Sequence, residues 1–106
     1  MRIYISGPMR GRTDYKERFE EAAAAIRAEG HNYINPAYLA EMIDGKSDDW
    51  YLAFDEYLIT LCDAICFLAG SENSVGVKRE RKWAKENGLA VYDLKTGTFT
   101  VEVQDD

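Results

Sequence analysis

The chain has 106 residues, 46% of them hydrophobic, and a formal net charge of −6 at neutral pH. This length predicts a single domain over residues 1–106 that can bury a core without disulfides or a metal. The negative charge argues against a nucleic acid polymer as partner, because phosphate backbones require a basic surface. No apolar run is long enough to span a membrane and no signal peptide is recognisable, so we expect a cytoplasmic protein with no membrane partner.

The cysteine and histidine content argues against a zinc site. Cys62 and Cys66 lie in an apolar stretch, and His31 is the one histidine of the sequence. A structural zinc needs about four such ligands. We therefore predict buried free thiols, and we expect no metal and no cofactor.

The first half of the chain alternates strand and helix patterns. Residues 2–6 (RIYIS) predict a strand ending at a Gly-Pro turn, and residues 14–29 predict a helix. Residues 31–35 (HNYIN) predict a second strand that Pro36 stops, and residues 37–46 predict a loop with a short helical turn. The first helix should bury one face, formed by Phe19, Ala22, Ala23 and Ile26.

The second half continues the alternation. Ser47, Asp48 or Asp49 can cap a helix that runs to about Leu61, in which apolar residues recur at helical spacing. Residues 63–70 (DAICFLAG) form an apolar run typical of a strand buried on both faces. Residues 73–88 predict a further helix, followed by strands at 89–94 and 98–103. The recurring apolar residues of the helix before DAICFLAG are Trp50, Phe54, Tyr57 and Leu58.

This order predicts an α/β fold. It should be a small doubly wound, Rossmann- or flavodoxin-like parallel sheet of four to five strands with helices on both faces. Ligands bind such sheets at the carboxyl ends of the strands. We therefore expect residues 6–12, the helix around Asp55 and residues 70–80 to converge on one cleft.

Glu80 is the most informative residue of this cleft. It lies three residues after Val77 and four before Ala84, so helical spacing turns its carboxyl towards the core. A buried carboxylate is costly unless it is paired or needed for function. The structural alternative is an ion pair with Arg10 or Arg79.

Other residues near the cleft suggest anion binding. Gly7 allows close approach of the backbone, and Arg10 could hold an anion. Ser74 and Gly76 precede a helix N-terminus, which favours anions, although capping is the commoner role of such a serine. Among the carboxylates, Asp55 should face the cleft, Glu56 the solvent, and Asp63 the opposite edge of the sheet.

The sequence resembles the nucleoside 2-deoxyribosyltransferase superfamily over about residues 2–94. The resemblance rests on IYISGPMRG, on Asp55 eight residues before the Asp63 of LCDAICFLAG, and on NSVGVKRERKWA. It is nearest to the short branch, which includes 2′-deoxynucleoside 5′-phosphate N-hydrolases and small proteins of the DUF4406 type. This resemblance implies the doubly wound fold and no metal.

The resemblance also implies roles for individual residues. Glu80 matches the nucleophile that attacks the sugar, Asp55 the acid that protonates the leaving base, and Tyr4 a residue that contacts both sugar and nucleophile. The matching substrate-binding residues are Ser6, Gly7, Met9, Arg10, Ser74 and Gly76. The implied activity is cleavage or transfer at the N-glycosidic bond through a covalent glutamyl-sugar intermediate.

Ser74 bears on the substrate. Transferases of free nucleosides tend to have an acidic residue six positions before the glutamate, whereas the phosphate-accepting hydrolases resemble this chain in having serine there. A 5′-monophosphate is therefore the favoured substrate, with a free deoxynucleoside as the other. Lys78 departs from the hydrolases, which have glycine at this position, and it could add a phosphate contact or crowd the site.

Two other readings stay open at this stage. The same loops could form a non-catalytic nucleotide-binding or sensing module, or the cleft could be vestigial in a structural subunit. The resemblance implies a homodimer or higher homo-oligomer. For most of the aromatic residues we expect core packing rather than base stacking or a subunit contact; these are Tyr33, Tyr38, Trp50 and Tyr51.

Overall fold

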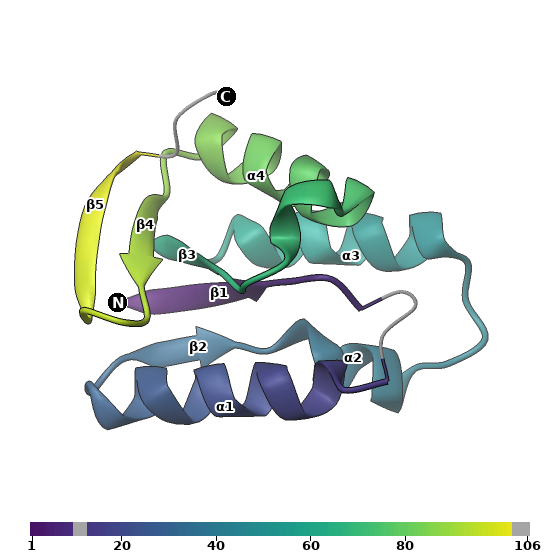
Figure 1. Cartoon of the computed structure of the whole chain (residues 1–106). Coiled ribbons are helices and arrows are strands. Elements are labelled where there is room, and N and C mark those ends of the chain that lie inside the picture. The colour runs from purple at the N-terminus through teal and green to yellow at the C-terminus, as the bar shows by residue number, and fades with distance from the viewer. Residues whose placement is uncertain (10–12, 103–106) are drawn as a thin grey trace.

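The computed structural model describes residues 1–9 and 13–102 and contains a five-stranded sheet of order β2-β1-β3-β4-β5 (Figure 1). Strands β1 to β4 pair in parallel, and β5 pairs antiparallel to β4 at the edge. The predicted doubly wound α/β fold is therefore confirmed. The strands are β1 (Arg2–Ser6), β2 (Asn32–Ile34), β3 (Ala64–Phe67), β4 (Ala90–Asp93) and β5 (Thr98–Glu102).

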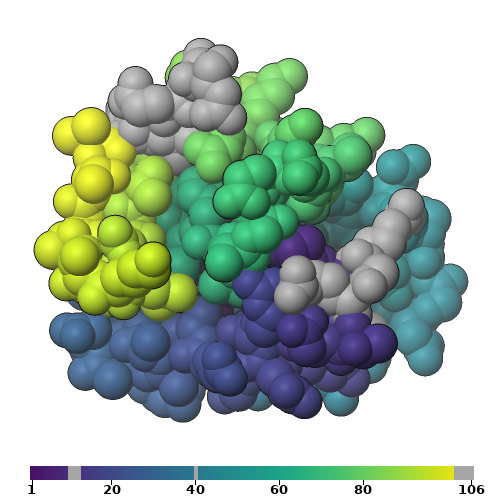
Figure 2. All heavy atoms as spheres, viewed as in Figure 1, coloured from purple at the N-terminus to yellow at the C-terminus, as the bar shows by residue number. Residues whose placement is uncertain are grey.

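Helices cover both faces of the sheet. Helices α1 (Tyr15–Ala28) and α2 (Pro36–Met42) lie on one face, and α3 (Asp48–Ile59) and α4 (Val75–Glu86) on the other (Figure 1). A short 3-10 helix, η1 (Ser71–Asn73), leads into α4. In the space-filling view β5 forms one outer edge of the molecule against β4 (Figure 2).

The central strand β1 is buried on both faces and divides the core in two. Its odd positions, Ile3 and Ile5, pack in the cluster that includes Phe19 of α1. Tyr4 packs in the second cluster, beneath α3 and α4, with Ile59. Because side chains alternate along a strand, Ser6 points to the same face as Tyr4. Both hydroxyls of β1 are thus directed towards α4.

The segment after β2 is more helical than the sequence predicts. The second strand ends at Ile34, and Asn35 caps a two-turn helix rather than continuing the strand. The Asn35 side chain accepts a hydrogen bond from the backbone N–H of Ala37, and Pro36 occupies the first helical position, where its missing N–H costs nothing.

The two helices that form the cleft begin at serine caps. Ser47 accepts a hydrogen bond from the N–H of Trp50, and Ser74 accepts one from the N–H of Val77. Helix α3 turns Asp55 and Ile59 to the interior, whereas Tyr57 is 61% exposed. None of the helices in residues 1–9 and 13–102 has the length and apolar character needed to cross a membrane.

Candidate functional site

Glu80 of α4 is buried against two hydroxyl groups of β1. Its side chain is 5% exposed. The Tyr4 hydroxyl donates a hydrogen bond to Oε2 at 2.5 Å, and the Ser6 hydroxyl donates one to Oε1 at 2.8 Å. Each carboxyl oxygen therefore has its own donor, and the orientation of the group is fixed from the strand side.

Asp55 of α3 completes the site and shares a hydrogen bond with Glu80. Its side chain is 8% exposed, and it is also hydrogen-bonded to Tyr4. Two buried carboxyls can approach this closely because they can share a proton.

The electrostatics of the pair follow from its burial. Burial, assisted by the nearby charge of Asp55, raises the pKa of Glu80 to about 8, although the hydrogen bonds from Tyr4 and Ser6 act against the rise. Burial also raises the pKa of Asp55 to about 7, against the effect of its hydrogen bonds to Glu80 and Tyr4. Near neutral pH the pair therefore holds about one proton and presents one acid and one carboxylate.

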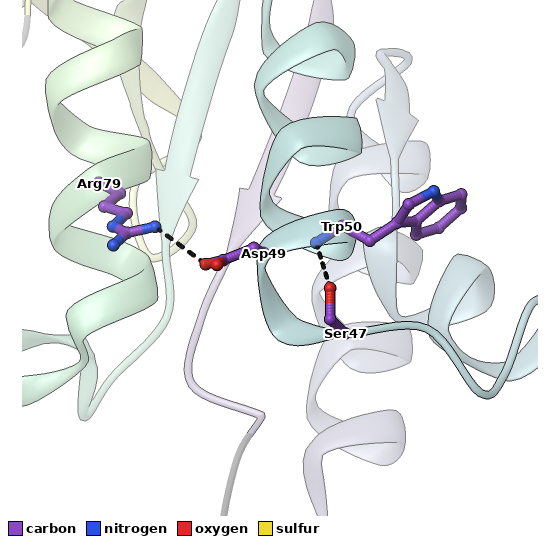
Figure 3. A network of polar contacts seen from close by, with 4 residues as sticks. All are labelled: Ser47, Asp49, Trp50 and Arg79. Carbon is purple, nitrogen blue, oxygen red and sulfur yellow. Dashed lines mark hydrogen bonds and ion pairs between the residues drawn. The ribbon is translucent and has the colours of Figure 1, made fainter.

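Arg79 does not neutralise Glu80. Its guanidinium extends from α4 towards α3 and lies 3.8 Å from the carboxylate of Asp49 (Figure 3). The structural alternative of a Glu80–Arg79 ion pair is therefore wrong. Arg10, the other cation considered, lies outside the described residues.

A cleft of about 880 Å³ opens in front of the two carboxyls. Three segments line it: Gly7 to Met9 after β1, residues 48–55 in α3, and residues from Gly70 to Glu80 through η1 and α4. These are the segments expected to converge at the carboxyl ends of the strands. Apolar side chains line the remainder of the cleft, from Phe19, Pro36 and Leu39.

The predicted substrate-binding residues divide between the cleft and its wall. Gly7, Met9, Ser74 and Gly76 line the cleft, as predicted from the sequence. Ser6 is fully buried and donates to Glu80, so it supports the carboxylate from behind instead of lining the cleft. Tyr4 is fully buried too and contacts Glu80 and Asp55.

Ser74 takes the commoner role expected for it, the cap of α4. Its oxygen accepts from a backbone N–H, which leaves the hydroxyl proton available to a ligand in the cleft. Lys78, which was considered as a further phosphate contact, is exposed and is not among the described residues that line the cleft. Arg79, which the sequence did not assign to substrate, lines it instead.

The prediction of core packing holds for only one of the four aromatic residues considered. Trp50 and Tyr51 line the cleft, and Tyr38 is 49% exposed, so core packing is wrong for these three. Tyr33 packs against the core cluster as expected. Helical spacing places Trp50 among the recurring apolar residues of α3, but this spacing does not show which face of the helix meets the sheet.

Residues assigned to structure behave as predicted. Asp63 accepts a hydrogen bond from the backbone N–H of Arg2 at 2.8 Å, at the edge of the sheet opposite the cleft. Glu56 is exposed. Cys62 and Cys66 are free and buried, and burial raises the pKa of both thiols to about 12, so they are unreactive in this setting.

Comparison with known proteins places the chain in a family. Residues 1–93 match the family model described as "Domain of unknown function (DUF4406)", and the chain belongs to this family. No curated protein matches it.

Two solved structures share the fold. One is a 2-deoxyribosyltransferase from Bacillus psychrosaccharolyticus, with 18% identity, a TM-score of 0.69, and coverage of 88% of this chain and 71% of that one. The other is the CMP N-glycosidase BcmB from Clostridium botulinum, with 22% identity, a TM-score of 0.62, and coverage of 88% and 67%. The resemblance to nucleoside 2-deoxyribosyltransferases is thus confirmed at the level of the fold.

Proposed function

We propose that this member of the DUF4406 family cleaves or transfers at the N-glycosidic bond of a 2′-deoxynucleoside 5′-monophosphate or deoxynucleoside. The observation that carries the proposal is the hydrogen-bonded pair of Glu80 and Asp55 at the wall of an 880 Å³ cleft. The two fold relatives are named for chemistry at such bonds, deoxyribosyl transfer and CMP N-glycosidase activity.

The first step is attack of a Glu80 oxygen on C1′ of the sugar. As the new C–O bond forms, the bond from C1′ to the base nitrogen breaks through an oxocarbenium-like state, and the electron pair leaves with the base. Asp55 donates its proton to the departing base. The products of this step are the free base and a deoxyribosyl ester of Glu80.

The second step releases the sugar. Asp55, now ionised, takes a proton from water, whose oxygen attacks C1′ and restores the Glu80 carboxylate. In a transferase an incoming base replaces the water. The chemistry uses only the side chains of Glu80 and Asp55, and hydrogen bonds from Tyr4 and Ser6 hold the nucleophile in place.

The shared proton must lie on Asp55 when the bond breaks. Burial raises the pKa of both carboxyls, so before substrate binds the two groups share a proton through their hydrogen bond. Positive charge that develops at C1′ stabilises the anionic form of Glu80 and draws the proton to Asp55 through their hydrogen bond. Proton transfer within the pair thus accompanies attack.

We also propose that the protein forms a homo-oligomer. Tyr57 in the last turn of α3 and Leu61 just after this helix are 61% and 42% exposed, which supports a subunit contact at this end of α3. Light scattering should give a mass above one chain, and Tyr57→Asp should lower it. A monomeric wild-type protein would contradict this part of the proposal.

The test of the reaction is a panel of deoxynucleosides and their 5′-monophosphates, scored for released base. Wild-type protein should release base from at least one of them, and Glu80→Gln should release none while keeping its circular dichroism spectrum. Binding without release would instead indicate a nucleotide-binding module.

A further inference from the structure

The charges along the cleft are strongly unequal. Of the described side chains that line it, four carry a carboxyl group and a single one, Arg79, is cationic. The four acidic side chains are Asp48, Asp49, Asp55 and Glu80. The exposed Asp49 carboxylate would repel a phosphorylated substrate on the α3 side, and among these residues only Arg79 could attract it by charge.

Arg79 is well placed for this purpose. It lies three residues after Gly76, on the first turns of α4, and next to Glu80 in the sequence. Its side chain bridges the gap between the two helices to reach Asp49, near the start of α3 (Figure 3). The guanidinium therefore lies between α4 and the first turn of α3, at the wall of the cleft.

The partner that holds Arg79 is easily exchanged. The two groups are 3.8 Å apart, and the side chains are 52% exposed for Arg79 and 91% exposed for Asp49. An exposed, long ion pair contributes little to stability. A phosphate dianion offers the guanidinium two parallel charge-assisted hydrogen bonds and more charge than a carboxylate.

We infer that, among the described residues, Arg79 is the one that selects a 5′-phosphorylated substrate, and that the phosphate replaces Asp49 as its partner on binding. Until then Asp49 keeps the guanidinium engaged at α3, away from the Glu80 carboxylate. This inference rests on the proposed function and deepens it, because it assigns the preference for a monophosphate to one side chain. It also separates Arg79 from its neighbour Lys78, which is exposed and is not among the described residues that line the cleft.

The first test measures binding without turnover. Isothermal titration calorimetry with 2-deoxyribose 5-phosphate is performed on wild-type protein, Arg79→Gln, Arg79→Lys and the matched control Lys78→Gln. Arg79→Gln should raise Kd by about tenfold or more, Arg79→Lys should raise it less, and Lys78→Gln should stay within about twofold. Equal effects of Arg79→Gln and Lys78→Gln, or no binding to wild-type protein, would overturn the inference.

The second test examines the exchange of partners. Asp49→Asn removes the competing carboxylate, so Kd for 2-deoxyribose 5-phosphate should fall by about two- to fivefold. An unchanged or higher Kd would contradict the exchange. Unaltered thermal unfolding of each variant, expected from the exposure of both side chains, shows that the change is local.

The third test uses turnover to distinguish this inference from the proposed reaction. Arg79→Gln should raise KM for the monophosphate, and kcat/KM for the monophosphate should fall relative to that for the unphosphorylated deoxynucleoside. Equal losses for both substrates would show a merely structural role. If phosphate binding depends on Arg79 but no base is released, the proposed reaction is refuted and the inference about Arg79 is preserved. If base is released from deoxynucleosides but phosphate is not bound, the reaction is preserved and the inference is refuted.

Discussion

The hydroxyl of Tyr4 in β1 lies 2.5 Å from Oε2 of Glu80 in α4, and both side chains are almost fully buried. This contact joins the central strand of the sheet to the helix that begins at the cleft. It is reinforced by Ser6, two residues further along β1 on the same face. The strand thus sets the position of the carboxylate, and its two hydrogen bonds limit the rise in the pKa of Glu80 that burial causes.

Tyr4→Phe removes one donor to Glu80 and keeps the ring that fills the core. Because Oε2 then lacks a buried partner, we expect unfolding to become easier by about 1–3 kcal/mol. Base release should slow by about 10- to 100-fold through kcat, since the nucleophile is less well held. Chemical denaturation and steady-state kinetics measure the two effects. Wild-type kcat in Tyr4→Phe would show that this contact has no part in catalysis.

Ser6→Ala should change the pH dependence of the reaction. The hydrogen bond from Ser6 lowers the pKa of Glu80, so its loss raises that pKa further. The rate depends on a Glu80 anion, and the acid limb of the kcat profile should therefore move to higher pH. Ser6→Thr retains a hydroxyl and serves as the control, with a smaller displacement. A limb that moves to lower pH would contradict the assignment.

The carboxyl pair also predicts how stability varies with pH. Folding raises the pKa of Asp55 from 3.8 to about 7 and that of Glu80 from 4.5 to about 8, so the folded protein binds more protons than the unfolded chain between these values. The contribution of this pair to the free energy of unfolding should be greatest below about pH 4. It should fall as pH rises to about 8, by at most about 1.4 kcal/mol per pH unit for each proton.

The matched variant is Asp55→Asn, which removes one of the two titrating groups. Thermal unfolding between pH 5 and pH 8 should show a smaller decrease in Tm for this variant than for wild-type protein. Identical slopes would show that Asp55 titrates in the folded protein as it does in the unfolded chain.

Replacement by alanine should destabilise the protein at Gly7 but not at Gly76. A Cβ on Gly7 would lie 2.9 Å from Cδ1 and 3.1 Å from Cβ of the buried Leu68, so Gly7→Ala should cost about 1–3 kcal/mol. A Cβ on Gly76 would make ordinary contacts, at 3.7 Å to Leu52 and 3.9 Å to Ser74. Gly76→Ala should therefore fold as well as wild type but bind 2-deoxyribose 5-phosphate more weakly. Equal thermal stability of the two variants would refute the packing argument.

Much of the fold could be predicted because the alternation of patterns is local. Burial of Phe19 and Ile26 follows from helical spacing, and the inward position of Glu80 follows from its place between Val77 and Ala84. Convergence of the three cleft segments follows from the geometry of any parallel sheet. For residues 37–46 the sequence predicts a loop with a short helical turn, and the structure has a helix over Pro36–Met42. Seven residues give too little periodicity to define its length, although Asn35-Pro36 is itself a start signal.

The finer features of the site depend on the sheet and could not be predicted from one segment. Whether Ser6 faces the cleft or the back of Glu80 depends on how α4 crosses β1, which sequence spacing does not give. Either Lys78 or Arg79 could line the cleft on sequence grounds. The orientation of α4 about its axis, which its packing against α3 determines, decides that Arg79 does. The contact of Asp55 with Glu80 depends on two helices that are adjacent only in space.

The most direct test of the account is to detect the sugar on Glu80. Wild-type protein is mixed with its best 2′-deoxynucleoside 5′-monophosphate, quenched in acid within one turnover, digested and analysed by mass spectrometry. The account predicts a deoxyribosyl phosphate adduct on the peptide that contains Glu80, and neither adduct nor base release in Glu80→Gln. Base release by Glu80→Gln at the wild-type rate, with no adduct on Glu80 in wild-type protein, would contradict it.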